Sequence, residues 1–277
     1  MAILRSPVLN VMVKAAEMAA KGLGRDFGEL EQLQVSVKGV GDFVSAADLR
    51  SEKIIRHELE KARPGYGFLM EESGYTEGTD GVHRWIVDPL DGTTNFLHGI
   101  PHFAISIALE REGEIIAGLI YNPVTDDRFY AEKGTGAFFN DRRMRVSARR
   151  KMEESVIATG IPHRGRGDHM AYIKQLAKVM STTAGIRRNG AASLDLAWTA
   201  AGRVDGFWEE GLAPWDVAAG VLMVREAGGY VSGLDSRDPV ISGNILASNE
   251  PLHYALLKLL QTQQKPAGDA ATADKQG

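Results

Sequence analysis

The sequence predicts a mixed fold, in which an α+β first half is followed by an α/β second half. Before Phe103, helical periodicities enclose short apolar strands, and from Phe103 to Glu132 apolar residues alternate as in meandering strands. After Ser155, strand and helix patterns alternate. The chain has 277 residues, 44% hydrophobic and 25% charged, which suffices for one large domain or two closely packed halves.

The first half begins with a helix. Ser6 is a good N-cap and Pro7 suits the first helical position, so we expect a helix from there to about Gly22. A second helix is expected over about Ala47 to Ala62, because Pro64 prevents its continuation. Short apolar runs at 68–70 and 85–87 predict two strands, and each runs into an acidic residue.

Strands dominate the middle of the chain. Alternating Phe103, Ile105, Ile107 and Leu109 predict one strand, and residues 114–121 predict the next. Residues 138–141 (Phe-Phe-Asn-Asp) predict a strand that enters a hairpin turn.

The second half is expected to alternate strands and helices. We predict strands near Val156 and Ile186, and helices near Met170, 194–201, 217–227 and 252–260. The organisation is therefore one fold over 1–264, with an N-terminal half of about 1–150 and a C-terminal half of about 151–264. Residues 265–277 carry no large apolar side chain and are expected to be a disordered tail.

Composition excludes several classes of function. The net charge of −4 does not suit a protein built to coat nucleic acid or anionic membrane. The absence of cysteine rules out disulfides, thiolate catalysis and zinc–thiolate sites. We see no membrane-spanning run and no secretion signal, so a cytoplasmic location is expected.

Three acidic motifs stand where regular elements begin or end. They are Glu71-Glu72-Ser73 after a strand, the run from Asp88 to Asn95 after another strand, and the run from Trp215 to Gly220 at a helix start. Each alone has a structural explanation, since Asp216 suits a helix cap and Asp-Pro or Asp-Gly steps suit turns. Capping and turn formation alone do not explain why so many polar residues are concentrated in the second motif, DPLDGTTN.

The second motif combines carboxylates with anion-binding amides. Asp88 and Asp91 flank a stiffening proline, and Gly92 and Thr93 follow with free N–H groups suited to phosphate oxygens. Two carboxylates about 4 Å apart repel by roughly 4 kcal/mol at an effective dielectric near 20, so convergence calls for protons or cations. Oxygen ligands without cysteine favour Mg²⁺, Ca²⁺ or Mn²⁺, and Mg²⁺ is the usual partner of phosphate chemistry.

The three motifs, in this order, resemble the signature set of the inositol monophosphatase family. The similarity runs from about Val8 to Leu260 and is strongest to bacterial inositol-1-monophosphatases, through the segments 190–197 and 202–207. The resemblance implies a five-layered αβαβα sandwich of the inositol monophosphatase and sugar phosphatase type, commonly a homodimer. It implies a Mg²⁺-dependent phosphomonoesterase with two or three ions per site, acting on inositol monophosphate and related polyol or sugar phosphates.

The resemblance also implies roles for individual residues. The metal ligands would be Glu71, Asp88, the Leu90 carbonyl, Asp91 and Asp216, with a third ion near Glu71 and the loop around Asp42. Glu71, Thr93 and Asp48 would activate the attacking water. The substrate contacts would be Gly92, Thr93, Gly190, Ala192, Glu209 and Asp216. The loop from Lys38 to Asp42 looks slightly shorter than in animal members, which weakens the expectation of a third ion.

Other functions remain open at this stage. Relatives with the same metal core hydrolyse fructose 1,6-bisphosphate, adenosine bisphosphates or histidinol phosphate, and bacterial members have been linked to transcription and RNA processing. The main basic cluster suits a solvated hairpin and linker, or a partner or RNA surface. It comprises Arg142, Arg143, Arg145, Arg149, Arg150 and Lys151. His98 and His102 are expected to be structural rather than catalytic.

Overall fold

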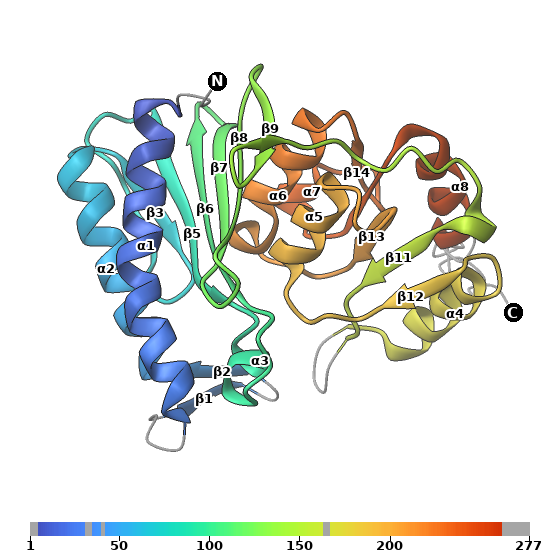
Figure 1. Cartoon of the computed structure of the whole chain (residues 1–277), viewed down its shortest axis with the longest axis horizontal. Helices are drawn as coiled ribbons and strands as arrows, with labels where there is room; N and C mark the ends of the chain where they lie inside the picture. The colour runs from blue at the N-terminus through green and yellow to red at the C-terminus, as the bar shows by residue number, and fades with distance from the viewer. Residues whose placement is uncertain (1–4, 31–34, 40–41, 163–166, 262–277) are drawn as a thin grey trace, which may run out of the picture.

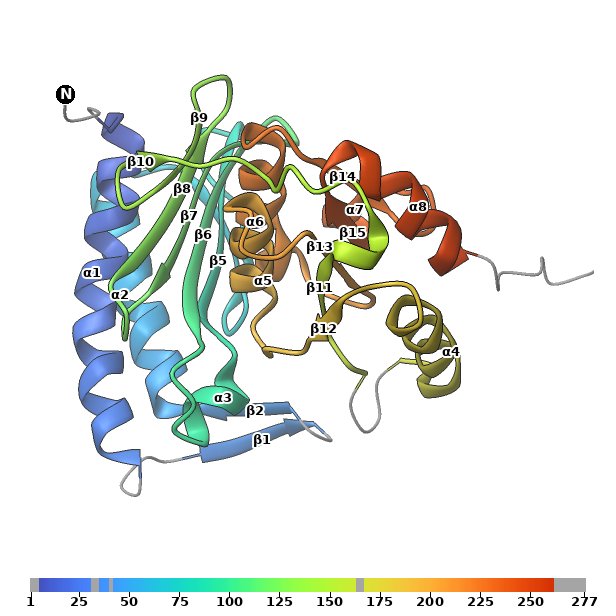
Figure 2. The ribbon, with the colours of Figure 1, turned by 45° about the vertical axis from the view of Figure 1, so that its right-hand side comes forward.

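The computed structural model describes residues 5–30, 35–39, 42–162 and 167–261, and the predicted tail lies outside them. Five layers alternate across the molecule (Figures 1 and 2): an outer helical layer, a large sheet, a central helical layer, a smaller sheet and a second outer helical layer. The predicted αβαβα sandwich is therefore confirmed. Among the described residues, no helix has both the length and the apolarity needed to cross a bilayer.

The first outer layer consists of α1 (Pro7–Gly28) and α2 (Ala46–Ala62). Ser6 caps α1 as predicted, by accepting a hydrogen bond from the Leu9 N–H, but the helix runs well past the expected end at Gly22. Its apolar stripe continues to Leu23, which is buried, so packing outweighs the glycines. The hairpin β1 (Val35–Gly39) and β2 (Asp42–Ser45) precedes α2.

The large sheet has eight strands in the order β10-β9-β8-β7-β6-β5-β3-β4. The predicted strands at 68–70 and 85–87 are parallel neighbours within it, and those at 103–109 and 114–121 form an antiparallel pair. The predicted turn after Phe139 is also present, with Asn140 and Asp141 both at positive φ. The strands are β3 (Gly67–Met70), β4 (Gly74–Thr76), β5 (His83–Asp91), β6 (Ala104–Arg111), β7 (Glu114–Asn122), β8 (Asp127–Glu132), β9 (Gly136–Phe139) and β10 (Arg142–Arg143).

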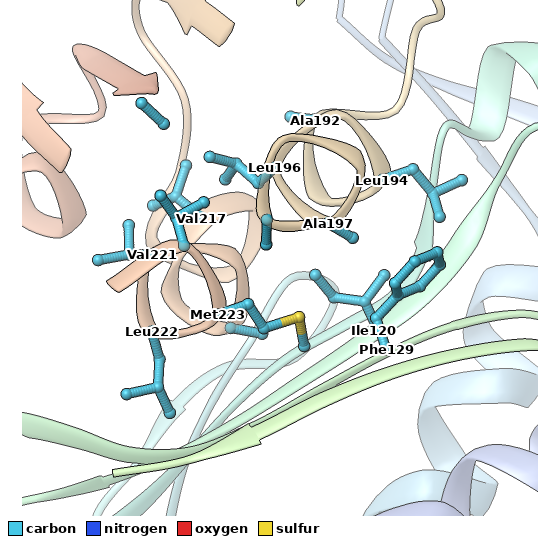
Figure 3. Close-up of a cluster of buried hydrophobic side chains, with 14 of the residues drawn as sticks. Ile120, Phe129, Ala192, Leu194, Leu196, Ala197, Val217, Val221, Leu222 and Met223 are labelled. Atoms are coloured by element: carbon cyan, nitrogen blue, oxygen red, sulfur yellow. The ribbon is translucent and has the colours of Figure 1, made fainter. Parts of the chain in front are cut away.

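Helices cover this sheet on both faces. Ile105 and Ile107 of β6 belong to the core under α1 and α2, whereas Ala104 and Ala108 belong to the core under the central helices. The central layer consists of α5 (Ala192–Ala200) and α6 (Pro214–Glu226). Figure 3 shows Leu194 of α5 and Met223 of α6 next to the sheet residues Ile120 and Phe129.

α6 lies unusually close to the sheet. A Cβ added to Gly118 of β7 would lie 3.0–3.2 Å from atoms of Ala219, so a larger residue here would push against α6. On the side facing α5, a Cβ on Gly220 would lie 2.5 Å from the Leu196 Cβ. These contacts fix the depth at which the N-terminus of α6 meets the sheet.

The smaller sheet is mixed, in the order β12-β11-β13-β15-β14. β11 pairs in parallel with β12 and β13, whereas β15 is antiparallel to β13 and β14. Its core is built around Trp208, Leu246 and Leu256. The remaining elements are β11 (Val156–Thr159), α4 (His169–Met180), β12 (Gly185–Arg187), β13 (Gly206–Glu209), β14 (Tyr230–Gly233), α7 (Pro239–Ser242), β15 (Ile245–Ser248) and α8 (Glu250–Gln261), with a short 3-10 turn at Met152–Glu154.

Candidate metal centre

A β-bulge brings the first two aspartates to one face of the sheet. Asp88 pairs with Ser106 and Asp91 with Ala104, so β5 spans three steps where β6 spans two. Residues three apart on a regular strand point to opposite faces, and one extra residue restores the same face. The bulge is held by the Leu90 N–H, which donates to Asp88 Oδ1 at 2.8 Å, and by the Ser51 hydroxyl, which donates to the Pro89 carbonyl at 2.8 Å.

The third aspartate comes from the start of α6. Asp216 occupies the third helical position, and its Oδ2 accepts a hydrogen bond from the Ala213 N–H at 2.7 Å. Asp216 is therefore not the N-cap residue that the sequence suggested; the N-cap is Ala213, and Asp216 reaches back to its backbone N–H from inside the first turn. The preceding Trp215 carbonyl accepts a hydrogen bond from the hydroxyl of Ser106, the strand partner of Asp88. This contact joins the start of α6 to the bulge.

The three carboxylates converge. One oxygen from each of Asp88, Asp91 and Asp216 lies within 4.8 Å of the others. Burial raises the pKa of Asp88 and of Asp216 well above the ordinary range, and repulsion among the acidic groups adds to both shifts. Burial also raises the pKa of Asp91, to about 6. The charged forms of all three groups are therefore destabilised unless a cation neutralises them.

Glu71 stands beside this group. Glu71 is not one of the three residues whose oxygens lie within 4.8 Å of one another. Its charge nevertheless contributes to the raised pKa of Asp88, Asp91 and Asp216. Its backbone N–H donates to the Val87 carbonyl at 3.2 Å, which fixes the turn after β3 next to β5. The side chain of Asp42 is not among those described, so the predicted third ion remains a prediction.

Ser193 at the start of α5 holds one side of the centre. Its backbone N–H and its hydroxyl both donate to Asp91 Oδ2, the former at 2.8 Å. Both hydrogen bonds favour the ionised carboxylate and lower the pKa of Asp91, against the effect of burial. Sequence reasoning assigned Ser193 no role, because nothing in the segment 190–197 shows that it faces a strand 102 positions earlier.

Thr93 and Asp48 are in contact. The Thr93 hydroxyl lies 3.0 Å from Asp48 Oδ1 and 3.1 Å from the Leu90 carbonyl, and its single hydrogen serves one acceptor at a time. The other oxygen of Asp48 accepts from the Ser45 N–H at 2.8 Å and from the Ser45 hydroxyl. Burial raises the pKa of Asp48 despite these hydrogen bonds. The hydroxyl is thus held at the edge of the carboxylate cluster.

Two loops close around the start of α3 (Thr93–Leu97). The Asn95 side chain donates to the His102 carbonyl at 2.7 Å and to the Asn189 carbonyl at 2.8 Å. Gly92, at φ +89°, has the Gly190 carbonyl 3.2 Å from the place where a Cβ would stand. Gly92, Gly190 and the neighbouring Ala192 are therefore brought together. The Asn95 side chain links the two loops by its hydrogen bonds, a role that the sequence did not indicate.

Glu209 is the last residue of β13. Its charge contributes to the raised pKa of Asp216, so the two carboxylates lie close enough to interact. Its carboxylate packs against the α-carbon of Gly160, where a Cβ would lie 1.8–2.1 Å from the carboxylate atoms. Any residue larger than glycine at position 160 would therefore displace the Glu209 carboxylate.

The histidines near the second motif have structural contacts. His98 Nδ1 lies 2.8 Å from the Thr94 carbonyl. His102 packs its edge against Trp198, with ring centroids 5.0 Å apart, and burial lowers its pKa to about 4. A neutral imidazole packed on an indole agrees with the structural role expected from the sequence.

The donor set suits a hard divalent cation. Carboxylate oxygens, with the Leu90 carbonyl between Asp88 and Asp91, are ligands of Mg²⁺, Ca²⁺ and Mn²⁺. Convergence of buried carboxylates with raised pKa values is the electrostatic signature of a site that takes a cation. The fold and the donor chemistry therefore support metal binding at this place.

Comparison with known proteins agrees with this geometry. Residues 4–265 match the inositol monophosphatase family. The chain is 59% identical over 258 residues to an inositol-1-monophosphatase of Mesorhizobium japonicum, covering 93% of this chain and 97% of the relative. It is 42% identical to the Nus factor SuhB of Pseudomonas aeruginosa, covering 94% and 98%.

A solved structure shares the fold. The extragenic suppressor protein suhB from Bartonella henselae superposes with a TM-score of 0.91 at 58% identity, covering 93% of this chain and all of that one. The acidic centre, the layered fold and the sequence relationships over nearly the whole chain agree. The chain belongs to the inositol monophosphatase family.

Proposed function

We propose that the protein is a Mg²⁺-dependent phosphatase that hydrolyses inositol monophosphate to inositol and inorganic phosphate. The observation that carries the proposal is the convergence of Asp88, Asp91 and Asp216 within 4.8 Å, beside the Thr93 hydroxyl. The high identity to inositol-1-monophosphatases over most of the chain supports the choice of substrate. Bound Mg²⁺ supplies a water of lowered pKa and charge to stabilise the leaving alkoxide.

Asp88, Asp91, Asp216, Glu71 and the Leu90 carbonyl would hold two ions, and a third is left open. Asp88 would help to hold both ions. The Ser193 hydrogen bonds keep Asp91 ionised and oriented, as outer partners of metal ligands usually do. These assignments rest on the donor set and on the family relationship.

Thr93 would orient the attacking water. When its hydroxyl donates to Asp48, its oxygen lone pairs remain free to accept a hydrogen bond from that water. Glu71 would take the water proton, and the N–H groups of Gly92 and Thr93 would hold phosphate oxygens. Water would attack phosphorus as the bond to the alcohol oxygen breaks, and the proton that Glu71 takes from the water would balance the proton that the alcohol oxygen takes from solvent.

The alcohol would lie between Ala192, Glu209 and Asp216, next to Gly190. Glu209 offers carboxylate oxygens that accept hydrogen bonds from ring hydroxyls, and Ala192 leaves room for the ring. The contact of Glu209 with Gly160 supports a fixed position for this carboxylate. The same centre would also accept related polyol or sugar phosphates.

A phosphate-release screen tests the proposal. With Mg²⁺ present, inositol 1-phosphate is expected to give the highest kcat/KM, above fructose 1,6-bisphosphate, adenosine bisphosphate and histidinol phosphate. If one of these three esters gave a kcat/KM tenfold higher than that of inositol 1-phosphate, that ester would be the substrate instead. Loss of all activity on EDTA treatment and recovery with Mg²⁺ is expected throughout.

A role in transcription is the second candidate. It is favoured by 42% identity to a protein named Nus factor SuhB. The basic cluster from Arg142 to Lys151 is partly neutralised, because Arg149 pairs with Asp205 and Lys151 with Glu154. Capture of the intact protein by immobilised RNA polymerase or RNA, abolished when Arg142 and Arg150 are changed to Glu, would support it.

A homodimer is proposed from the family relationship, and sedimentation gives the test.

A further inference from the structure

The side chain of Asn95 joins two backbone segments that meet beside the metal centre. Asn95 belongs to α3 and is 4% exposed. Its amide nitrogen carries two hydrogens, and it donates to the His102 carbonyl at 2.7 Å and to the Asn189 carbonyl at 2.8 Å. Both acceptors are therefore served at once. The second hydrogen bond crosses from the first half of the chain to the loop between β12 and α5.

The loop that Asn95 holds leads directly into α5, whose first residue is Ala192. The Asn189 side chain donates to Asp195 Oδ1 at 2.6 Å. The carbonyl of Asn189 is thus bound by α3, while its side chain is bound by α5. The Asn95 contact therefore sets where this loop, and Ala192 after it, lies relative to the first half of the chain.

The two segments touch through glycines. Gly92 and Gly190 are both at φ +89°. A Cβ on Gly92 would lie 3.2 Å from the Gly190 carbonyl, and a Cβ on Gly190 would lie 3.1–3.2 Å from the amide atoms of Asn95. Contacts this short prevent the loop from moving closer to α3. The hydrogen bond from Asn95 to Asn189 opposes movement in the other direction, away from α3.

The two sides of this junction carry different parts of the proposed site. The N–H groups of Gly92 and Thr93 would hold phosphate oxygens, whereas Ala192 would border the alcohol. Both hydrogens of the Asn95 amide are used by backbone carbonyls, and Asp91 is held by other donors. Loss of the Asn95 donor should therefore displace the alcohol side of the site and leave the metal ligands in place.

We propose that Asn95 is a positioning residue for the alcohol part of the substrate. Through the Asn189 carbonyl it fixes the distance between the phosphate-binding amides and the start of α5, and so determines how well a phosphate ester that carries a ring fits. Asn95 does not touch the reacting atoms. This inference rests on the proposed function, since it assigns a residue to the alcohol side of that site.

Kinetics with two esters test this role. Asn95→Leu keeps the branching at Cγ and removes both N–H donors. For inositol 1-phosphate we expect KM to rise about tenfold or more and kcat to change less than about threefold, because interactions made equally in the ground state and the transition state affect KM alone. For glycerol 2-phosphate, which has no ring to place, kcat/KM should change less than about threefold. Calorimetry of inositol 1-phosphate binding, with Ca²⁺ in place of Mg²⁺, should show the same loss of affinity.

Asn249→Leu is the matched control. Asn249 is 5% exposed, and its amide also donates to two backbone carbonyls, those of Ser147 and Arg149, at 2.7 Å each. This variant should lower the melting temperature at least as much as Asn95→Leu and leave both KM values unaltered. Asn189→Ala is a second variant, which frees the same loop from α5 while Asn95 is kept, and it should raise the KM for inositol 1-phosphate about threefold or more.

Three results would overturn the positioning role. The first is a KM for inositol 1-phosphate in Asn95→Leu that stays within about threefold of the parent value, and the second is an equal loss with glycerol 2-phosphate. If Asn95→Leu does not fold, an unchanged KM in Asn189→Ala is the third. A parent protein that binds inositol 1-phosphate without hydrolysing it would instead count against the proposed function alone, and the calorimetric comparison would still test Asn95.

Discussion

Ser193 donates two hydrogen bonds to one oxygen of Asp91, from its backbone N–H and from its hydroxyl. The contact joins α5 of the second half to the bulge in β5 of the first half. It favours the ionised form of a carboxyl whose pKa burial raises to about 6. The metal centre thus depends on packing between the halves as well as on the motif that carries Asp91.

Ser193→Ala should weaken metal binding without unfolding the protein. The backbone hydrogen bond remains, while the hydroxyl bond is lost, and a hydrogen bond to a charged group contributes about 1.5–3 kcal/mol. We expect the Mg²⁺ concentration for half-maximal activity to rise about tenfold. Ser155→Ala, which removes another buried hydroxyl that donates to the Lys151 carbonyl, is the control. An unchanged Mg²⁺ dependence in Ser193→Ala would show that the hydroxyl does not support the ligand.

Asp216→Asn separates capping from metal binding. The asparagine oxygen can still accept from the Ala213 N–H, so the melting temperature without metal should change little. Turnover should fall by more than the roughly 10–100-fold that is typical of outer-shell partners. Near-normal turnover at limiting and saturating Mg²⁺ would leave Asp216 with the capping role only.

Thr93→Val tests the hydroxyl next to the cluster. The replacement keeps the shape, removes the hydrogen bond to Asp48, and should lower kcat by about a hundredfold or more, the usual size of a proton-transfer contribution. Thr94→Val changes the exposed neighbour in the same way and should leave kcat unaltered. Equal kcat values for the two variants would remove Thr93 from the proposed water activation.

Asp195 predicts a pH dependence of stability. Burial raises its pKa from 3.8 to about 8, although the Asn189 amide donates to it at 2.6 Å. As the pH rises, the carboxyl loses its proton at a lower pH in the unfolded chain than in the folded protein. Its contribution to the free energy of unfolding is therefore fully present below about pH 4 and is lost towards about pH 8. In EDTA, the free energy of unfolding of the parent should therefore fall between about pH 5 and 8 relative to that of Asp195→Asn. A constant difference across that range would mean that Asp195 is ionised in the folded protein.

Local patterns in the sequence predicted several strands of the large sheet. Alternating apolar residues located β6 and β7, and the turn pair Asn140-Asp141 located the β9–β10 hairpin. The motifs also singled out Asp88, Asp91 and Asp216, because carboxylates beside turn residues and a helix start are locally recognisable. The family resemblance supplied the layer order, which local patterns do not contain.

Long-range pairing could not be predicted. The bulge that turns Asp88 and Asp91 to one face depends on the register of β5 against β6. The antiparallel placement of β15 depends on its neighbours in the sheet, and α1 extends past Gly22 because Leu23 belongs to a buried core. The supporting contacts of Ser193 and Asn95 span 102 and 94 positions, and polar residues carry no local mark of such partners.

The central claim is that the converging carboxylates hold divalent cations. A ligand that binds only the folded state stabilises it by about 2.7 kcal/mol at one hundred times its Kd. Asp88→Asn keeps an acceptor for the Leu90 N–H but removes the charge of the proposed bridge between two ions. It should lose most of the stabilisation by Mg²⁺, and without metal it should be at least as stable as the parent because one repelling charge is gone.

The most direct measurement is a thermal shift series across Mg²⁺ concentrations for the parent and Asp88→Asn, with EDTA as the baseline. The account predicts that Mg²⁺ raises the melting temperature of the parent by several degrees and that of Asp88→Asn by much less. Equal shifts for the two proteins would contradict it, since Asp88 would then hold no ion.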